Sequence, residues 1–238
     1  MGQAKVDRVA SSRRIVTADG KFHGRMSAGG RNPALAALPE GQIDPLLKTV
    51  TFARGDKPLV RLHYYATHPQ SYYGDPRVTM DFVGLAREQL EQEEGVPQVY
   101  FTGCAGDVAA GKYNDGTPRA RDELTGRLLA GMRAAAAATR FEPAGRLQWR
   151  TEPLVLPLKS APGFTLSELR AKMVDAKEKP HLRILAARRI AGYGDGCTNY
   201  ICTEQAFREG GYEPSASTVG PQSETLLKAA IDRLLKTE

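Results

Sequence analysis

The chain has 238 residues, of which 41% are hydrophobic and 25% are charged. These proportions are ordinary for a globular protein of one large or two small domains, and they exclude a chain that is disordered throughout. The net charge of +6 comes from Lys and Arg spread along the chain. This charge predicts a solvated basic surface and no nucleic-acid partner, and an anionic partner is the alternative.

Residues 1–42 are polar and rich in Gly, Arg and Ser, so we expect an irregular N-terminal arm. Residues 49–53 and 58–67 are rich in β-forming side chains and predict two strands. Residues 79–93 follow a helical period, and a short β-rich run at 99–101 predicts another strand. A strand, a helix and a strand in this order predict a βαβ unit with loop residues at its strand ends.

The second half of the chain predicts further helices and one strand. Thr117 followed by Pro118 is typical of a helix start, and Thr165 to Glu168 has the spacing of a capping box. The remaining expected elements are a strand at 146–157 and helices at 179–190 and 221–236. The fold class is therefore α/β, a mixed sheet with flanking helices and at least one βαβ unit, in a single domain over 1–238.

No apolar run is long enough to span a membrane, and residues 1–5 lead into polar sequence, so neither an integral membrane segment nor a signal peptide is expected. The cysteines Cys104, Cys197 and Cys202 form no C-x-x-C pair. Their odd number argues against a disulfide framework, and a bond between Cys197 and Cys202 stays open. These features do not define the cellular compartment of the protein.

His68 is the first candidate for chemistry, because it ends an apolar strand and enters a polar loop. A histidine in that place presents a ring nitrogen to a metal ion or makes structural hydrogen bonds. His63 lies five residues earlier and points to the opposite face of the sheet, so we do not expect the two to share an ion.

A second candidate is the glycine-rich segment 103–116, in which Gly106 to Lys112 fits the spacing of a phosphate-binding loop. Tyr113 stands where such a loop has Ser or Thr, and a turn follows where a helix should start. The alternative is a strand-to-helix turn without a ligand. The third candidate is a tyrosine-bearing segment, 193–203, followed by Tyr212.

Taken together, these segments resemble neutral ceramidases. Their sequences are most similar to those of short bacterial members with a ceramidase-type N-terminal domain. Ala66-Thr67-His68-Pro69-Gln70-Ser71, followed by Asp81-Phe82-Val83-Gly84, resembles the family's second zinc-histidine segment. Gly103-Cys104-Ala105-Gly106-Asp107-Val108 resembles its nucleophile loop, and Asn199-Tyr200-Ile201-Cys202-Thr203 its zinc-tyrosine segment, with Tyr212 as a second active-site tyrosine. The likeness covers most of residues 43–235, in matching order.

The resemblance implies a zinc-dependent amidohydrolase that cleaves a linear amide such as an N-acylsphingosine, hence a small-molecule or lipid amide substrate. It implies His68 and Tyr200 as zinc ligands and Asp107 and Tyr212 as catalytic residues. Family members are often secreted or periplasmic. The metal supplies Lewis-acid chemistry and an activated water in such enzymes.

Several positions depart from the family pattern. The family's first zinc histidine would lie upstream of residue 1, and the strand that carries its glutamate ligand is replaced by the helix predicted at 179–190. Ala109 stands where the family has a loop serine. We therefore expect a form shortened at the N-terminus and internally deleted, with impaired or no activity, since a catalytic zinc normally has three protein ligands.

Other hypotheses stay open beside the shortened hydrolase. One is a non-catalytic interaction module, and a weaker one is nucleotide binding through Gly106 to Lys112. The missing ligands have other sources in principle, namely a second subunit, His23 or His181.

Overall fold

The computed structural model describes residues 1–145, 148–192 and 199–236. The chain divides into two compact units, residues 1–145 and 146–238, where the sequence predicted a single domain. Within the described residues, no helix combines the length and the apolar character needed to cross a membrane.

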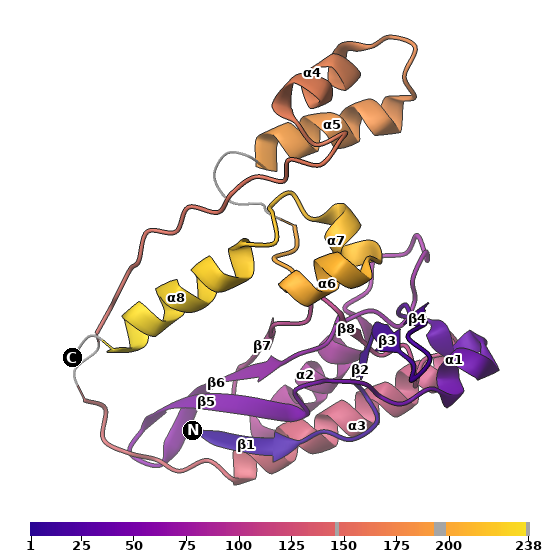
Figure 1. Ribbon diagram of the computed structural model, residues 1–238. Helices are drawn as coiled ribbons and strands as arrows, with labels where there is room; N and C mark the ends of the chain where they lie inside the picture. Colours follow the sequence, from indigo (N-terminus) through magenta and orange to yellow (C-terminus); the bar gives the residue numbers. More distant parts are fainter. Residues whose placement is uncertain (146–147, 193–198, 237–238) are drawn as a thin grey trace. The chain divides into compact units, whose positions relative to one another are not determined.

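The first unit is built on a mixed sheet with the strand order β1-β5-β6-β7 (Figure 1). The strands β1 (Gly2–Lys5), β5 (Leu46–Arg54) and β6 (Lys57–Tyr65) are antiparallel neighbours, whereas β7 (Gln98–Thr102) runs parallel to β6. Helix α2 (Asp81–Glu94) connects β6 to β7. The α/β class and the predicted βαβ unit are therefore confirmed.

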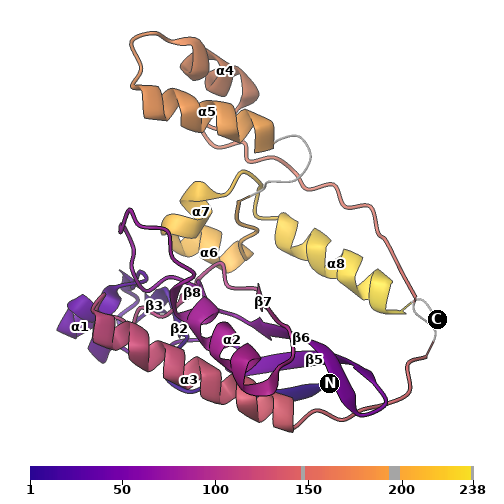
Figure 2. The same ribbon diagram turned by 180° about the vertical axis from the view of Figure 1, so that it is seen from behind.

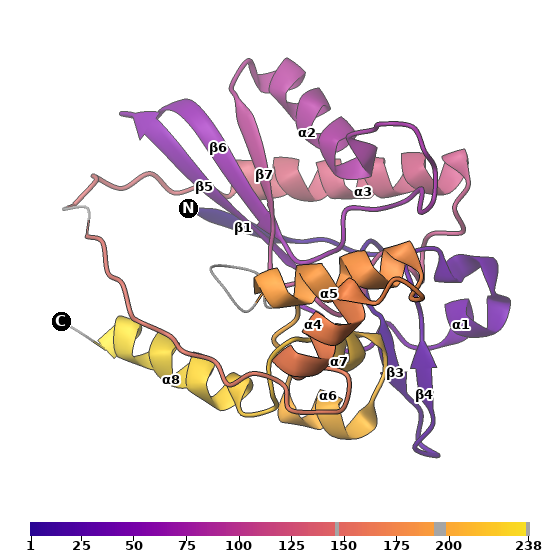
Figure 3. The ribbon, with the colours of Figure 1, turned by 90° about the horizontal axis from the view of Figure 1, so that it is seen from above.

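Two helices lie side by side on one face of this sheet, α2 and α3 (Pro118–Ala137) (Figures 2 and 3). Helix α3 begins as predicted, because the Thr117 hydroxyl accepts a hydrogen bond from the Ala120 N–H at 3.2 Å. Each large apolar side chain buried between helices and sheet contributes about 1.5–3 kcal/mol. The largest of them are Leu47, Tyr65, Phe82, Leu90, Leu124, Leu128 and Met132.

Residues 1–42 differ from the irregular arm that the sequence predicted. β1 is part of the main sheet and packs so closely on α3 that a Cβ on Gly2 would lie 2.0 Å from the Ala135 carbonyl oxygen. The partners of β1 and β2 lie far along the chain, in β5 and β8, so the local sequence carries no periodic signal for these two strands. Its other elements are β2 (Ser11–Ser12), β3 (Arg14–Val16), β4 (Phe22–Gly24), η1 (Gly29–Arg31) and α1 (Pro33–Ala37).

A buried arginine holds this arm together. Arg25 is fully buried and donates hydrogen bonds of 3.0–3.2 Å to the carbonyl oxygens of Ser12, Leu35, Leu38 and Glu40. The burial lowers the pKa of its guanidinium from the usual value. Two of these carbonyls lie in or just after α1, where a cation complements the helix dipole.

The short strand β8 (Val108–Ala109) pairs with β2 in antiparallel fashion. Ser11 lies opposite Ala109 in this pair, and the Ser11 hydroxyl donates to the Ala109 carbonyl oxygen at 2.9 Å. The N-terminal arm is thereby fixed against the loop that follows β7.

The second unit is mainly helical. Its capping box is present as predicted, because Thr165 and Glu168 bind each other's backbone N–H groups at the start of α4. Helices α4 and α5 lie side by side (Figure 3). The helices of this unit are α4 (Leu166–Val174), α5 (Pro180–Gly192), α6 (Glu204–Glu209), α7 (Tyr212–Ala216) and α8 (Ser223–Lys236).

The strand predicted at 146–157 is wrong for its described part. Residues 148–157 form no strand, and the only nearby pairing within the described chain is an isolated bridge between Leu158 and Val219. A strand is stable only when a neighbour satisfies its backbone groups along its length, and among the described residues this segment pairs only at its end, where the Gly220 N–H donates to the Pro157 carbonyl oxygen at 2.9 Å.

Candidate functional site

His68 meets the loop after β7 because β6 and β7 are parallel neighbours, so their carboxyl ends lie at the same edge of the sheet. The backbone N–H of His68 and its ring Nδ1 both lie 2.9 Å from the Val108 carbonyl oxygen. A carbonyl oxygen only accepts, so Nδ1 carries the proton. In the neutral ring, Nε2 then presents a lone pair.

Arg13 donates a hydrogen bond to that lone pair. Its Nη1 lies 3.2 Å from His68 Nε2, and its Nη2 donates to the Met26 sulfur at 3.3 Å. The Arg13 side chain is almost fully buried, and its backbone N–H donates to the Asp107 carbonyl oxygen at 2.6 Å. The sequence analysis did not single out Arg13, because its contact with His68 joins residues far apart in the chain.

Asp107 lies half-buried in the turn before β8, next to the Val108 carbonyl that orients His68. Among the described residues its carboxylate makes no hydrogen bond or ion pair. Ala109, where the resemblance leads one to expect a serine, is fully buried. The structure thus brings the His68 and Asp107 segments together, while the catalytic role of Asp107 stays a prediction.

The loop after His68 is fixed by a buried polar network that the sequence analysis missed. The Asp81 carboxylate accepts hydrogen bonds from the Ser71 N–H at 2.8 Å, the Ser71 hydroxyl at 2.5 Å and the Phe82 N–H at 2.6 Å. The Asn114 side-chain amide donates to the carbonyl oxygens of Ser71, at 2.8 Å, and Ser27, at 2.7 Å. The sequence features that could have predicted this network are the polar residue at the start of α2 and the Asn-Asp-Gly turn that begins at Asn114.

Asp81 adopts a left-handed backbone conformation, with φ 53°. A residue other than glycine rarely adopts this conformation, although Asp and Asn tolerate it best. The hydrogen bonds to Ser71 and Phe82 fix it, and they determine the path of the chain between His68 and α2.

Lys112 is not arranged as the lysine of a phosphate-binding loop. Its ammonium group donates to the carbonyl oxygens of Ala36, at 2.6 Å, and Leu38, at 2.5 Å, and its backbone N–H donates to the Ser11 hydroxyl. The chain then turns at 114–116, and α3 begins only at Pro118. The helix N-terminus that a phosphate-binding loop needs directly after the lysine is missing here.

His63 is a structural histidine. It is fully buried, and its ring nitrogens lie 2.8 Å from the Thr49 hydroxyl and 2.7 Å from the Gln98 side-chain oxygen. Burial lowers its pKa, and the hydrogen bond with Gln98 opposes this shift in part. Both ring nitrogens are engaged, which agrees with the expectation that His63 and His68 do not share an ion.

In the second unit, Tyr200 and Tyr212 lie in contact. Their ring centroids are 5.8 Å apart and the rings meet edge to face, an arrangement that aromatic pairs prefer. Tyr212 begins α7 and is half exposed, and the Tyr200 carbonyl oxygen accepts a hydrogen bond from the Ser217 hydroxyl at 2.8 Å. The sequence segment around Tyr193 and Cys197 lies outside the described residues, as does the bond considered between Cys197 and Cys202.

The structure therefore forms two pairs from the predicted site residues, His68 with the Asp107 loop in the first unit and Tyr200 with Tyr212 in the second. That all four belong to one centre stays a prediction.

The zinc that the resemblance implies does not fit the described residues around His68. A zinc ion bonded to Nε2 would lie about 2.0–2.1 Å from it, along the lone pair that accepts the hydrogen bond from Arg13. The guanidinium is itself a cation and repels a metal ion at that point. Within the described residues, no three or more His, Cys, Asp or Glu side chains are grouped to hold a metal ion.

Neither a family model nor a curated protein sequence matches this chain. A solved structure titled "Ceramidase complexed with C2" matches with a TM-score of 0.41 and 15% identity. The match covers 57% of this chain and 21% of that one. A match at this level identifies neither a family nor an activity.

Proposed function

We propose that the chain is a ceramidase-like amidohydrolase scaffold in which Arg13 keeps zinc from His68, so that it does not cleave an N-acylsphingosine in this form. The order of the matched segments supports the ceramidase-like part. The observation that carries the rest is the 3.2 Å contact between Arg13 Nη1 and His68 Nε2.

The orientation of the His68 ring supports the ceramidase-like part further. Histidines that bind metals nearly always donate their second ring N–H to a carbonyl or carboxylate, which fixes the tautomer. His68 has that arrangement, with Nδ1 on the Val108 carbonyl. Its outward nitrogen nevertheless binds a guanidinium, so the ring is oriented like a metal ligand while its lone pair is engaged elsewhere.

Zinc content and amide hydrolysis test this proposal together. We expect the dialysed protein to bind zinc weakly and to release no fatty acid from a labelled N-acylsphingosine. Arg13→Leu removes the cation and its hydrogen bond to Nε2, and we expect it to tighten zinc binding by about tenfold or more. Arg13→Leu with His68→Ala should lose this gain.

Two matched controls separate the local effect from a general one. Arg54→Leu removes an exposed arginine of β5, and His181→Ala removes an exposed histidine of α5. Neither should change zinc affinity. Stoichiometric zinc in the wild type together with hydrolysis that His68→Ala abolishes would overturn the proposal, and so would an Arg13→Leu variant that binds zinc no better than the wild type.

A further inference from the structure

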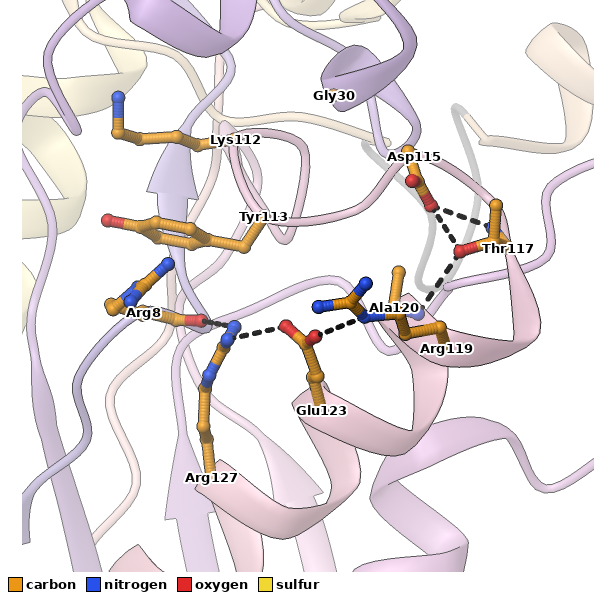
Figure 4. A pocket seen from close by; sticks show the side chains of 10 residues that line it. All are labelled: Arg8, Gly30, Lys112, Tyr113, Asp115, Thr117, Arg119, Ala120, Glu123 and Arg127. Atoms are coloured by element: carbon orange, nitrogen blue, oxygen red, sulfur yellow. Dashed lines mark hydrogen bonds and ion pairs between the residues drawn. The ribbon is translucent and has the colours of Figure 1, made fainter.

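A hollow of about 280 Å³ lies in the first unit beside the first turns of α3 (Figure 4). It is separate from the His68 contacts, although Lys112 and Tyr113 on its wall follow β8 directly in the chain. Its lining side chains come from the N-terminal arm, from the loop after β8 and from α3. They include Arg8, Tyr113, Asp115, Arg119, Glu123 and Arg127.

The lining carries an excess of positive charge. It has the four cationic side chains of Arg8, Lys112, Arg119 and Arg127 against two carboxylates, which leaves two positive charges unbalanced. The start of α3 adds to them, because the N-terminal end of a helix carries a partial positive charge. A hollow with this balance favours an anion.

Two of the four cations are held by the protein itself. Arg127 donates through Nη1 to the Arg8 carbonyl oxygen at 3.1 Å and through Nη2 to Glu123 at 2.6 Å. The Lys112 ammonium is bound to the carbonyl groups of α1 and Leu38. These groups shape the wall and keep few donors for a ligand.

Arg8 and Arg119 keep donors for a ligand. Arg119 donates through Nε to Glu123 at 3.0 Å, and its two terminal nitrogens make no hydrogen bond to another described residue. The Arg8 guanidinium lies 5.8 Å from the centroid of the Tyr113 ring, and no carboxylate of the described residues pairs with it. Figure 4 shows the guanidinium groups of Arg8 and Arg119 on either side of Glu123.

The backbone of Arg8 is strained, with φ 58° in the left-handed region. Such a conformation is energetically unfavourable in a residue other than glycine. It persists because the Arg127 guanidinium binds the Arg8 carbonyl oxygen. Strain of this kind is concentrated at ligand-binding positions, and here it holds the chain where the side chain lies over Tyr113.

We propose that this hollow binds a tetrahedral oxyanion, the phosphate group of a small phosphate ester or inorganic phosphate, with the guanidinium groups of Arg8 and Arg119 as hydrogen-bond donors. The planar guanidinium offers paired N–H groups that match phosphate oxygens. The volume of about 280 Å³ is at the lower end for small-molecule sites, so it suits one phosphate group and a small substituent more than a nucleotide.

Binding of inorganic phosphate by the full chain tests this site. Calorimetry at constant ionic strength should give saturable binding of one phosphate. Arg8→Asn removes the guanidinium but tolerates the left-handed backbone, and we expect it to weaken phosphate binding by about tenfold or more. Arg8→Lys keeps the charge without the paired donors and should bind with intermediate affinity. Arg54→Asn, an exposed arginine outside the hollow, should bind as the wild type does.

Each other outcome counts against the site. Absence of saturable binding in the wild type overturns it, as does equal weakening by Arg8→Asn and Arg54→Asn, which indicates a general charge effect. Acetate that competes as strongly as phosphate would show that the hollow does not select a tetrahedral oxyanion. Arg119→Gln should also weaken phosphate binding and tests the site independently of Arg8. The Arg119 side chain is exposed, so this substitution does not disturb the core.

Discussion

Arg13 and His68 form a contact of 3.2 Å between Nη1 and Nε2, and the other ring nitrogen of His68 binds the Val108 carbonyl oxygen at 2.9 Å. The two contacts determine the chemistry of this ring. The carbonyl requires the proton on Nδ1, and the guanidinium requires a lone pair on Nε2. His68 is therefore held as a neutral acceptor toward a cationic side chain.

The first prediction concerns this tautomer. Nitrogen NMR of the ring at neutral pH should show His68 protonated at Nδ1, with Nε2 as an acceptor, because the Val108 carbonyl cannot donate. Arg13→Leu should leave the proton on Nδ1 and shift the Nε2 signal, since that nitrogen loses its donor. Arg54→Leu is the control. A ring protonated at Nε2 in the wild type would contradict the geometry.

The second prediction concerns Arg25. Arg25→Leu leaves the carbonyl oxygens of Ser12, Leu35, Leu38 and Glu40 without the guanidinium, and an unsatisfied buried polar group costs about 1–3 kcal/mol. We expect the first unit to lose about 2–4 kcal/mol of stability. Hydrogen exchange of amides in residues 1–145 measures this loss without assuming that both units unfold together. Arg54→Leu should lose less than about 0.5 kcal/mol.

The third prediction concerns the network behind the His68 loop. Asp81→Asn keeps the left-handed backbone but replaces a carboxylate that accepts from the Ser71 N–H and hydroxyl. Together with Ser71→Ala it forms a double-mutant cycle, for which we expect a coupling free energy of about 1–2 kcal/mol. Urea unfolding measures it. Additive effects of the two substitutions would show that the contact contributes no coupling.

The fourth prediction concerns pH. Burial, supported by the hydrogen bond from its hydroxyl to Glu40, raises the pKa of Tyr113 to about 12. In the unfolded chain this phenol loses its proton near pH 10. The folded protein therefore retains this proton to a higher pH than the unfolded chain does. The contribution of Tyr113 to stability is complete below pH 10 and is lost as the pH rises toward 12.

Tyr113→Phe removes this contribution to the pH dependence. We expect the stability of the variant to fall less steeply between pH 10 and 12 than that of the wild type, as measured by urea unfolding at several pH values. Glu40→Gln keeps the burial and removes the anion, so it should retain part of the slope. Equal slopes for Tyr113→Phe and the wild type would contradict the assignment.

The sequence by itself determined the elements that local signals specify. The caps at Thr117 and Thr165 marked two helix starts correctly, because a side chain that satisfies free N–H groups acts within one turn. The βαβ unit also followed from the chain order, and with it the meeting of the His68 loop and the loop after β7. Parallel neighbours place their carboxyl ends together whatever the detail of the loops.

The tertiary structure decided what depends on long-range contacts. In the arm over 1–42, β1 and β2 form because they pair with β5 and β8, whereas the segment 148–157 forms no strand. Arg13 reaches His68 only through the pairing of β2 with β8. A histidine's neighbours in sequence predict where it stands, but the group that its ring nitrogen binds is set by the path of the whole chain, and here that group is a cation.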